Sequence, residues 1–302
     1  MSKRGQALNE IIQIMIKEIV FNGIKDFNLV HIFECGQCFR WNKEDEDSYI
    51  GIASGYVARA TFNNGTLTLE VSGGDEAFWG HYLDLETDYK KIKSTLINIE
   101  TANLSPMEQN RVLKPVPDGT KLAIEYGYGI RILNQDIFET MISFIVSQNN
   151  NIPRIKKCIE AICERYGEPL GTFWGKERFA FPSAEALAKA TPCALAELGL
   201  GYRNEYIPRA ARQFLEEGTP SSYEQVLSYH GIGPKVANCI MLFGLHKVDA
   251  FPIDTWVKHI MNDMYGFEES DTRGMANFAK EIFGSFAGYM QQYLFYYYRD
   301  RK

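Results

Sequence analysis

The 302-residue chain is 45% hydrophobic and 23% charged, a composition typical of a globular protein with a sizeable core. Its net charge of −6 excludes a general polycation, so any binding of nucleic acid must use a local surface. No run approaches the roughly 20 apolar residues of a membrane span, and Gln13, Lys17 and Glu18 interrupt the first apolar run, which argues against a signal peptide.

The N-terminal part is predicted to begin with a helix and to continue as strands. Residues 6–20 have the spacing of an amphipathic helix. Alternating apolar and polar residues then predict short strands, at 27–33, 39–42, 48–62 and 65–71. Asn64-Gly65 is a strong hairpin signal, and Gly73-Gly74 indicates a second turn. The charged run 43–47 is expected to be a solvated loop.

Helical spacing returns from Asp75 to about residue 112. The Pro- and Gly-containing stretch 113–121 is predicted to be a linker, and beyond it the pattern is almost wholly helical. We therefore expect an α+β protein with two domains. A small antiparallel β-sheet domain would span residues 1–115, and a mostly α-helical body would span 116–302.

The six cysteines do not form a recognisable metal or cluster site, since there is only one C-x-x-C pair and no group of four. Cys35 and Cys38 could form half of a zinc site, but no second pair has ligand spacing. Two buried thiols in a reducing cytosol are the simpler interpretation. No metal and no cofactor are expected.

A glycine hairpin followed by a helix is predicted at His230-Gly231-Ile232-Gly233-Pro234-Lys235. The glycines permit a tight turn and close approach of another backbone, and Pro234 suits the first turn of a helix. Residues 235–243 have helical spacing, and Gly244 stands where a helix commonly ends. Free N–H groups at such a helix start form a natural seat for a phosphate.

Lys235 and Asp254 are the candidate catalytic pair. Lys235 lies in the first helical turn, where the helix dipole opposes a cation and favours a neutral, nucleophilic amine. Asp254 precedes the next helical pattern, so it is expected to cap that helix and present its other oxygen to a site. The plainer alternatives are a solvated lysine and a purely structural cap.

These residues resemble the signature of the helix-hairpin-helix DNA glycosylases: a Gly-apolar-Gly hairpin, a lysine shortly after it, and an aspartate one helix further on. The lysine matches the branch that also cleaves the DNA strand. Other segments are similar, in the same order, to the eukaryotic-type 8-oxoguanine DNA glycosylase family, and they are residues 35–41, 147–154, 198–203 and 288–295.

The resemblance implies a reaction and a base pocket. Lys235 would attack C1′ of a flipped nucleotide, displace 8-oxoguanine and form a Schiff base that permits β-elimination, and Asp254 would stabilise the positive charge on the sugar. The remaining pocket residues would read or stack on the base: the Gly36 carbonyl at N7–H, Cys239 and Phe295 on the two faces, and Gln291 at the Watson–Crick edge.

The resemblance also implies how DNA is held. Gly231 and Gly233 would bind phosphate, Tyr202 would enter the base stack, and Asn149 would fill the gap beside the unpaired base. Arg154 and Arg203 would read the opposite base and favour cytosine. The partner is therefore expected to be double-stranded DNA containing 8-oxoguanine, bound by a monomer in a prokaryotic cytoplasm or a nucleus, with no membrane involved.

Two positions depart from the family pattern. Trp256 stands where eukaryotic members carry a histidine, and Tyr298 where they carry the aspartate that pairs with it. The lip of the pocket is therefore expected to differ. Two other functions remain as alternatives: an alkylpurine glycosylase that uses Asp254 without a nucleophilic lysine, and a non-catalytic DNA-binding protein that uses the hairpin alone.

Overall fold

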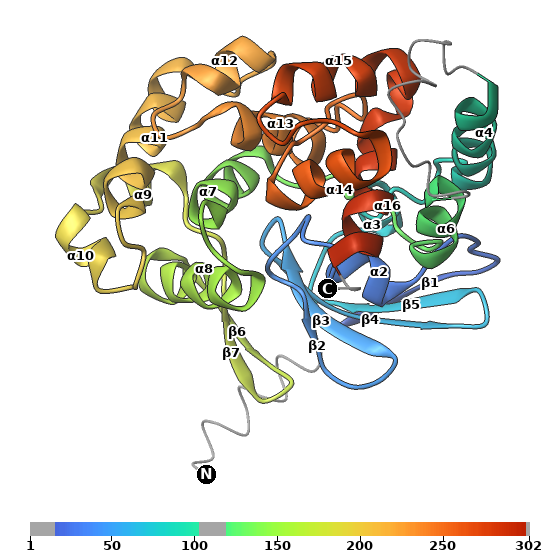
Figure 1. Ribbon diagram of the computed structural model, residues 1–302. Coiled ribbons are helices and arrows are strands. Elements are labelled where there is room, and N and C mark those ends of the chain that lie inside the picture. The colour runs from blue at the N-terminus through green and yellow to red at the C-terminus, as the bar shows by residue number, and fades with distance from the viewer. Residues whose placement is uncertain (1–15, 103–118, 300–302) are drawn as a thin grey trace.

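The computed structural model describes residues 16–102 and 119–299. Within them, a five-stranded antiparallel sheet is followed by a body built mostly of helices (Figure 1). The strand order is β1-β5-β4-β3-β2, and the strands are β1 (Lys17–Phe21), β2 (Asn42–Lys43), β3 (Ser48–Ala53), β4 (Tyr56–Asn63) and β5 (Thr66–Val71). The predicted α+β class is confirmed.

Two tight hairpins set the register of the sheet. Asn64 and Gly65 join β4 to β5 with φ of 50° and 79°, the positive pair that a type I′ turn requires, so this predicted turn is confirmed. Ser54 and Gly55 join β3 to β4 in the same manner, with φ of 47° and 82°. The stretch 48–62 is therefore two strands and a turn.

Two predictions for the N-terminal part are wrong where the structure describes it. Residues 17–21 belong to an edge strand paired with β5, not to a helix, and residues 6–15 of that prediction lie outside the described residues. The predicted strand 27–33 is instead helix α2 (Leu29–Phe33). Its start is fixed by Asn28, whose side chain accepts hydrogen bonds from the backbone N–H of the next turn, and this cap outweighs strand propensity.

The predicted strand 39–42 is also shorter than expected, since within it only Asn42 pairs in a strand. Trp41 just before it is fully buried beneath the sheet. It stacks on Phe33 with ring centroids 4.1 Å apart and donates its indole N–H to the Tyr82 hydroxyl. A Cβ on Gly51 would lie 2.2 Å from the Trp41 ring, so the glycine in β3 makes room for this tryptophan.

Two helices follow the sheet as predicted, α3 (Glu76–Tyr82) and α4 (Tyr89–Ala102). Most of the predicted linker, together with residues 103–112, lies outside the described residues. Its last part is not a linker, because Gly119 begins helix α6 (Gly119–Tyr126).

The helical body surrounds α7 (Ile137–Ser147), whose apolar sequence is buried over nearly its whole length. The hairpin of β6 (Pro169–Phe173) and β7 (Lys176–Phe179) departs from the wholly helical pattern. The remaining helices are α8 (Ile152–Tyr166), α9 (Ala184–Lys189), α10 (Pro192–Ala196), α11 (Arg203–Glu217), α12 (Tyr223–Ser228), α13 (Pro234–Phe243), α14 (Thr255–Tyr265), α15 (Thr272–Ile282), η1 (Gly284–Phe286) and α16 (Ala287–Arg299).

The last helix returns to the N-terminal part of the chain. Helix α16 packs on α6 and α14, and Arg299 donates a hydrogen bond of 2.7 Å to the Glu34 carbonyl. Helix α16 thus connects the helical body to the loop that follows α2 (Figure 1).

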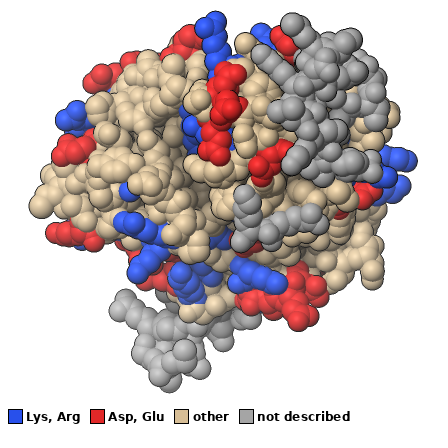
Figure 2. Space-filling view, in the orientation of Figure 1, with Lys and Arg blue, Asp and Glu red and all other residues tan. Residues whose placement is uncertain are grey.

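None of the described helices is long and apolar enough to cross a bilayer. On the face shown in Figure 2, the Lys and Arg side chains lie interspersed with Asp and Glu. This mixture agrees with the net charge of −6.

Candidate active site

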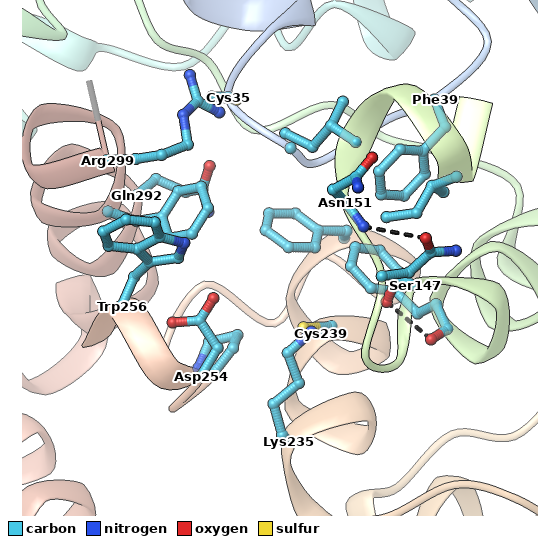
Figure 3. A pocket seen from close by; sticks show the side chains of 18 of the residues that line it. Cys35, Phe39, Ser147, Asn151, Lys235, Cys239, Asp254, Trp256, Gln292 and Arg299 are labelled. Carbon is cyan, nitrogen blue, oxygen red and sulfur yellow. Dashed lines mark hydrogen bonds between the residues drawn. The ribbon is translucent and has the colours of Figure 1, made fainter. Parts of the chain in front are cut away.

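A pocket of about 380 Å³ opens where α7, α13, α14 and α16 meet the loop after α2 (Figure 3). It brings together every residue predicted for catalysis and for the base pocket, although they come from distant parts of the chain. Those six are Gly36, Lys235, Cys239, Asp254, Gln291 and Phe295.

The glycine hairpin presents the start of α13, as predicted. Gly231 has φ of 81°, and a Cβ there would lie 2.6 Å from the Tyr206 ring, so both conformation and packing require glycine. Gly233 is the N-cap of α13, and a Cβ there would meet nothing within 4 Å. The helix ends at Phe243 as predicted, although Gly244 is not left-handed, with φ of −104°.

Lys235 enters the pocket from the first turn of α13. Its Nζ lies 5.6 Å from the centre of the Phe144 ring, and Cys239 is one turn further along the same helix. Burial raises the pKa of the Cys239 thiol, while Lys235 lowers it by a smaller amount. Cys239 is therefore a neutral apolar neighbour of the amine.

Asp254 both caps a helix and faces the pocket, which is the arrangement expected of it. Its Oδ1 accepts a 2.8 Å hydrogen bond from the Val257 N–H and so caps α14. In Figure 3 the carboxylate faces the pocket across from Lys235 and Cys239. Burial raises the pKa of Asp254, while the bonds from the amides of the cap and the charge of Lys235 oppose that rise.

The Gly36 loop is held by its neighbour, Gln37, which is 1% exposed. The Gln37 amide donates to the carbonyls of Ile32 (2.9 Å) and Arg131 (2.7 Å), and its oxygen accepts from the Leu133 N–H. These bonds fix the loop at a glycine with φ of 81°. A Cβ on Gly36 would lie 3.5 Å from the Phe295 ring, so the two residues lie next to each other in the lining of the pocket.

Cys35 and Cys38 are buried free thiols, as the simpler interpretation predicts. Burial raises the pKa of Cys35 to about 12, so it stays protonated. Among the described residues, no group of His, Cys, Asp and Glu has the arrangement of a metal site.

Helix α16 supplies one wall of the pocket. Gln291 and Phe295 lie one turn apart on it, as predicted. The sequence interpretation missed Gln292 and Arg299, which also line the pocket. Trp256 from α14 contributes to the same wall, which places an indole at the position where the family pattern differs (Figure 3).

The residues predicted to hold DNA lie outside the pocket, on three connected loops and on the first turns of α8 and α11 that follow two of them. The loops are 148–151, 199–203 and 230–234. Arg203 donates to the carbonyls of Gln148 and Asn149, while Arg154 donates to the Gly199 carbonyl at 3.1 Å. The Gln148 amide donates to the Gly231 carbonyl at 2.9 Å, which joins the hairpin to the other two loops.

These loops also place side chains at the surface. Tyr202 is 48% exposed, and Asn149, also exposed, has φ of 44°, a conformation that asparagine tolerates better than most residues. Arg203 is only 4% exposed, and its guanidinium lies 4.6 Å from the Tyr202 ring centre. Arg154 is the more accessible of the two arginines.

Two known families match adjoining parts of the chain, and the two matches meet within α7. Residues 19–141 match the N-terminal domain of 8-oxoguanine DNA glycosylase. Residues 142–284 match the HhH-GPD superfamily of base excision DNA repair proteins.

Individual relatives agree with these matches. The N-glycosylase/DNA lyase of Saccharomyces cerevisiae is 39% identical over 158 residues, which are 45% of this chain and 42% of the yeast protein. The N-glycosylase/DNA lyase OGG1 of Arabidopsis thaliana is 30% identical, over 87% of this chain and 75% of the plant protein.

A solved structure is similar over nearly the whole chain. It is the Clostridium acetobutylicum 8-oxoguanine glycosylase/lyase in complex with double-stranded DNA containing cytosine opposite 8-oxoguanine. The sequences are 35% identical, the TM-score is 0.83, and the match covers 95% of this chain and 98% of the clostridial one.

Proposed function

Because the chain belongs to the 8-oxoguanine DNA glycosylase family of the HhH-GPD superfamily, we propose that it removes 8-oxoguanine from double-stranded DNA and then nicks the strand. The observation that carries the proposal is the meeting of Lys235 and Asp254 in one pocket that Gly36 and Phe295 also line. The lysine distinguishes this reaction from that of an alkylpurine glycosylase using aspartate alone, and the pair distinguishes it from simple DNA binding.

In the proposed reaction the Lys235 amine attacks C1′ of a nucleotide turned out of the helix. The bond from C1′ to N9 breaks, and the base leaves with the bonding electrons and takes up a proton. The amine loses a proton and the sugar ring opens to a Schiff base. Loss of a C2′ proton then expels the 3′ phosphate by β-elimination, which nicks the strand.

Asp254 acts on the charge that develops at the sugar. As the bond to the base breaks, positive charge accumulates on C1′ and the ring oxygen, and a fixed carboxylate in a half-buried pocket stabilises it. The cap at Val257 holds the carboxylate in place, so little reorganisation is needed during the reaction. Asp254 also orients the amine of Lys235.

The base pocket discriminates through hydrogen bonding and stacking. Position 7 of guanine is an acceptor, whereas in 8-oxoguanine it is an N–H donor, which the Gly36 carbonyl accepts. Phe295 stacks on one face of the base and Cys239 packs on the other. Gln291 bonds the Watson–Crick edge.

The three connected loops hold the duplex. The N–H groups at the start of α13 bind a phosphate, and Gly233 leaves open space for its approach. Tyr202 enters the stack and Asn149 fills the space beside the unpaired base. Arg154 reads the opposite cytosine by donating to one of its acceptors, O2 or N3. For Arg203 to donate to the other acceptor, its guanidinium must first leave the carbonyls of Gln148 and Asn149. The protein acts as a monomer wherever its DNA lies, in a prokaryotic cytoplasm or a nucleus.

The test is borohydride trapping on a duplex with 8-oxoguanine opposite cytosine. The unmodified protein should give a covalent complex and release the base, and Lys235→Gln should give neither while still binding the damaged duplex. Lys247→Gln, at an exposed lysine after α13, is the matched control and should trap normally. Normal excision by Lys235→Gln would exclude the covalent mechanism.

A further inference from the structure

The pocket contains a second buried amide, Gln292, to which the proposed function gives no role. Gln292 is 2% exposed and lines the pocket next to Gln291, which is 4% exposed. Its Nε2 donates a 2.9 Å hydrogen bond to Oε1 of Gln291. Its own Oε1 is buried without a hydrogen-bond partner in the part of the chain that the structure describes.

An unpaired buried acceptor is a cost to the fold. An apolar side chain of similar size at this position would avoid that cost, and the rest of α16 is largely aromatic and aliphatic. The presence of the Gln292 amide is therefore better explained by the hydrogen bond that its Nε2 donates. That donor end contacts the side chain proposed to read the base.

We propose, on the basis of the function proposed above, that Gln292 is a positioning residue that fixes the orientation of the Gln291 amide. A glutamine amide has an acceptor end and a donor end, and a rotation of 180° exchanges them. Because Gln292 donates to Oε1 of Gln291, that oxygen faces its neighbour. The Nε2 donor of Gln291 is then left to face the base.

This orientation determines which damaged purine is accepted. 8-Oxoguanine and 8-oxoadenine share the C8 carbonyl and the N7–H group, so the Gly36 carbonyl cannot distinguish them. They differ at position 6, where guanine has a carbonyl acceptor and adenine an amino donor. A fixed Nε2 donor on Gln291 bonds the first and repels the second.

The test uses Gln292→Met, which keeps the length of the side chain and removes its polar atoms. Single-turnover excision rates are measured on duplexes carrying 8-oxoguanine or 8-oxoadenine, both opposite cytosine. The preference for 8-oxoguanine should fall roughly tenfold, as expected when a hydrogen bond to a buried base edge loses its fixed geometry. The melting temperature should stay the same or rise, because the unpaired acceptor is gone.

A matched control separates this effect from general repacking of the helix. Tyr293, the next residue on α16, also has a buried polar atom without a partner among the described residues, but it does not line the pocket. Tyr293→Phe should therefore leave the preference unchanged. If Gln292→Met does not fold, Gln292→Leu takes its place.

A double-mutant cycle tests whether Gln292 acts through Gln291. In a Gln291→Met background, Gln292→Met should change the preference by less than about twofold. An equal loss in both backgrounds, an unchanged preference in the single variant, or equal slowing on both substrates would overturn the inference. Failure of the unmodified protein to release 8-oxoguanine would instead refute the proposed function.

Discussion

The two hairpin glycines should respond in opposite ways to alanine substitution. Gly231 has φ of 81°, and its added Cβ would lie 2.6 Å from Tyr206 Cγ. Left-handed backbone costs an alanine about 1–2 kcal/mol, and overpacking costs typically 1–3 kcal/mol. Tyr206 cannot easily move away, because it packs edge-on against both Tyr202 and His230. We expect Gly231→Ala to lose about 2–5 kcal/mol of stability.

Gly233→Ala should instead leave stability intact. Its φ of −98° suits any residue, and the new methyl group meets nothing within 4 Å. Alanine restricts the unfolded chain but is a poorer N-cap than glycine, and these two small effects oppose each other. DNA affinity should fall, however, because the methyl group keeps a phosphate away from the amides of α13. Loss of one hydrogen bond to a charged group, about 1.5–3 kcal/mol, corresponds to roughly 10- to 150-fold in Kd.

Thermal unfolding and binding to an 8-oxoguanine duplex measure the two effects, with Lys235→Gln as the background so that no product forms. Gly231→Ala should lower Tm by roughly 3–8 °C. Gly55→Ala is the control for backbone strain alone, since Gly55 has φ of 82° and open space around it. The reasoning would be refuted if Gly231→Ala melted at the same temperature as the parent protein, or if Gly233→Ala bound the duplex as tightly as the parent protein does.

Three further substitutions test the pocket and the loops. Asp254→Asn should lose most activity with little change in Tm, since asparagine still caps α14, and a collapse of Tm would show a structural role. In the wild type, activity should fall on the acid side at a pH above the ordinary aspartate pKa, because burial raises the pKa of Asp254. Gly36→Ala should reduce discrimination between 8-oxoguanine and guanine more than DNA affinity, and equal loss on both bases would contradict the N7 reading. Arg154→Met should flatten a preference of about 1–3 kcal/mol for cytosine opposite the lesion while excision persists, as single-turnover rates on all four opposite bases would show.

The sequence predicted the pocket better than it predicted the sheet. Lys235 and Asp254 could be paired because a glycine hairpin, a helix start and a helix cap each depend on a few neighbouring residues, which can be recognised in the sequence. The strand at Lys17–Phe21 could not be predicted from helical spacing, because its conformation is set by pairing with β5, about fifty residues away. Asn28 shows the converse, a local cap that strand periodicity concealed.

The side-chain contacts that the sequence did not predict have a common physical reason. Gln37 and Gln292 act through side-chain hydrogen bonds whose partners depend on the folded structure. The sequence around a glutamine does not identify such a partner. Arg203 is similar, since the surface arginine expected from the family pattern is buried and bonded to two carbonyls of another loop.

The return of α16 to the Glu34 loop affects how this protein is made. One wall of the pocket comes from residues 291–299 and the facing loop from residues 35–36, so the two ends of the described chain complete the same cavity. The pocket is therefore complete only after residues 291–299 have been synthesised and have packed against this loop. Contacts so far apart in sequence also slow folding, and a truncated translation product lacking α16 would lack this wall of the pocket.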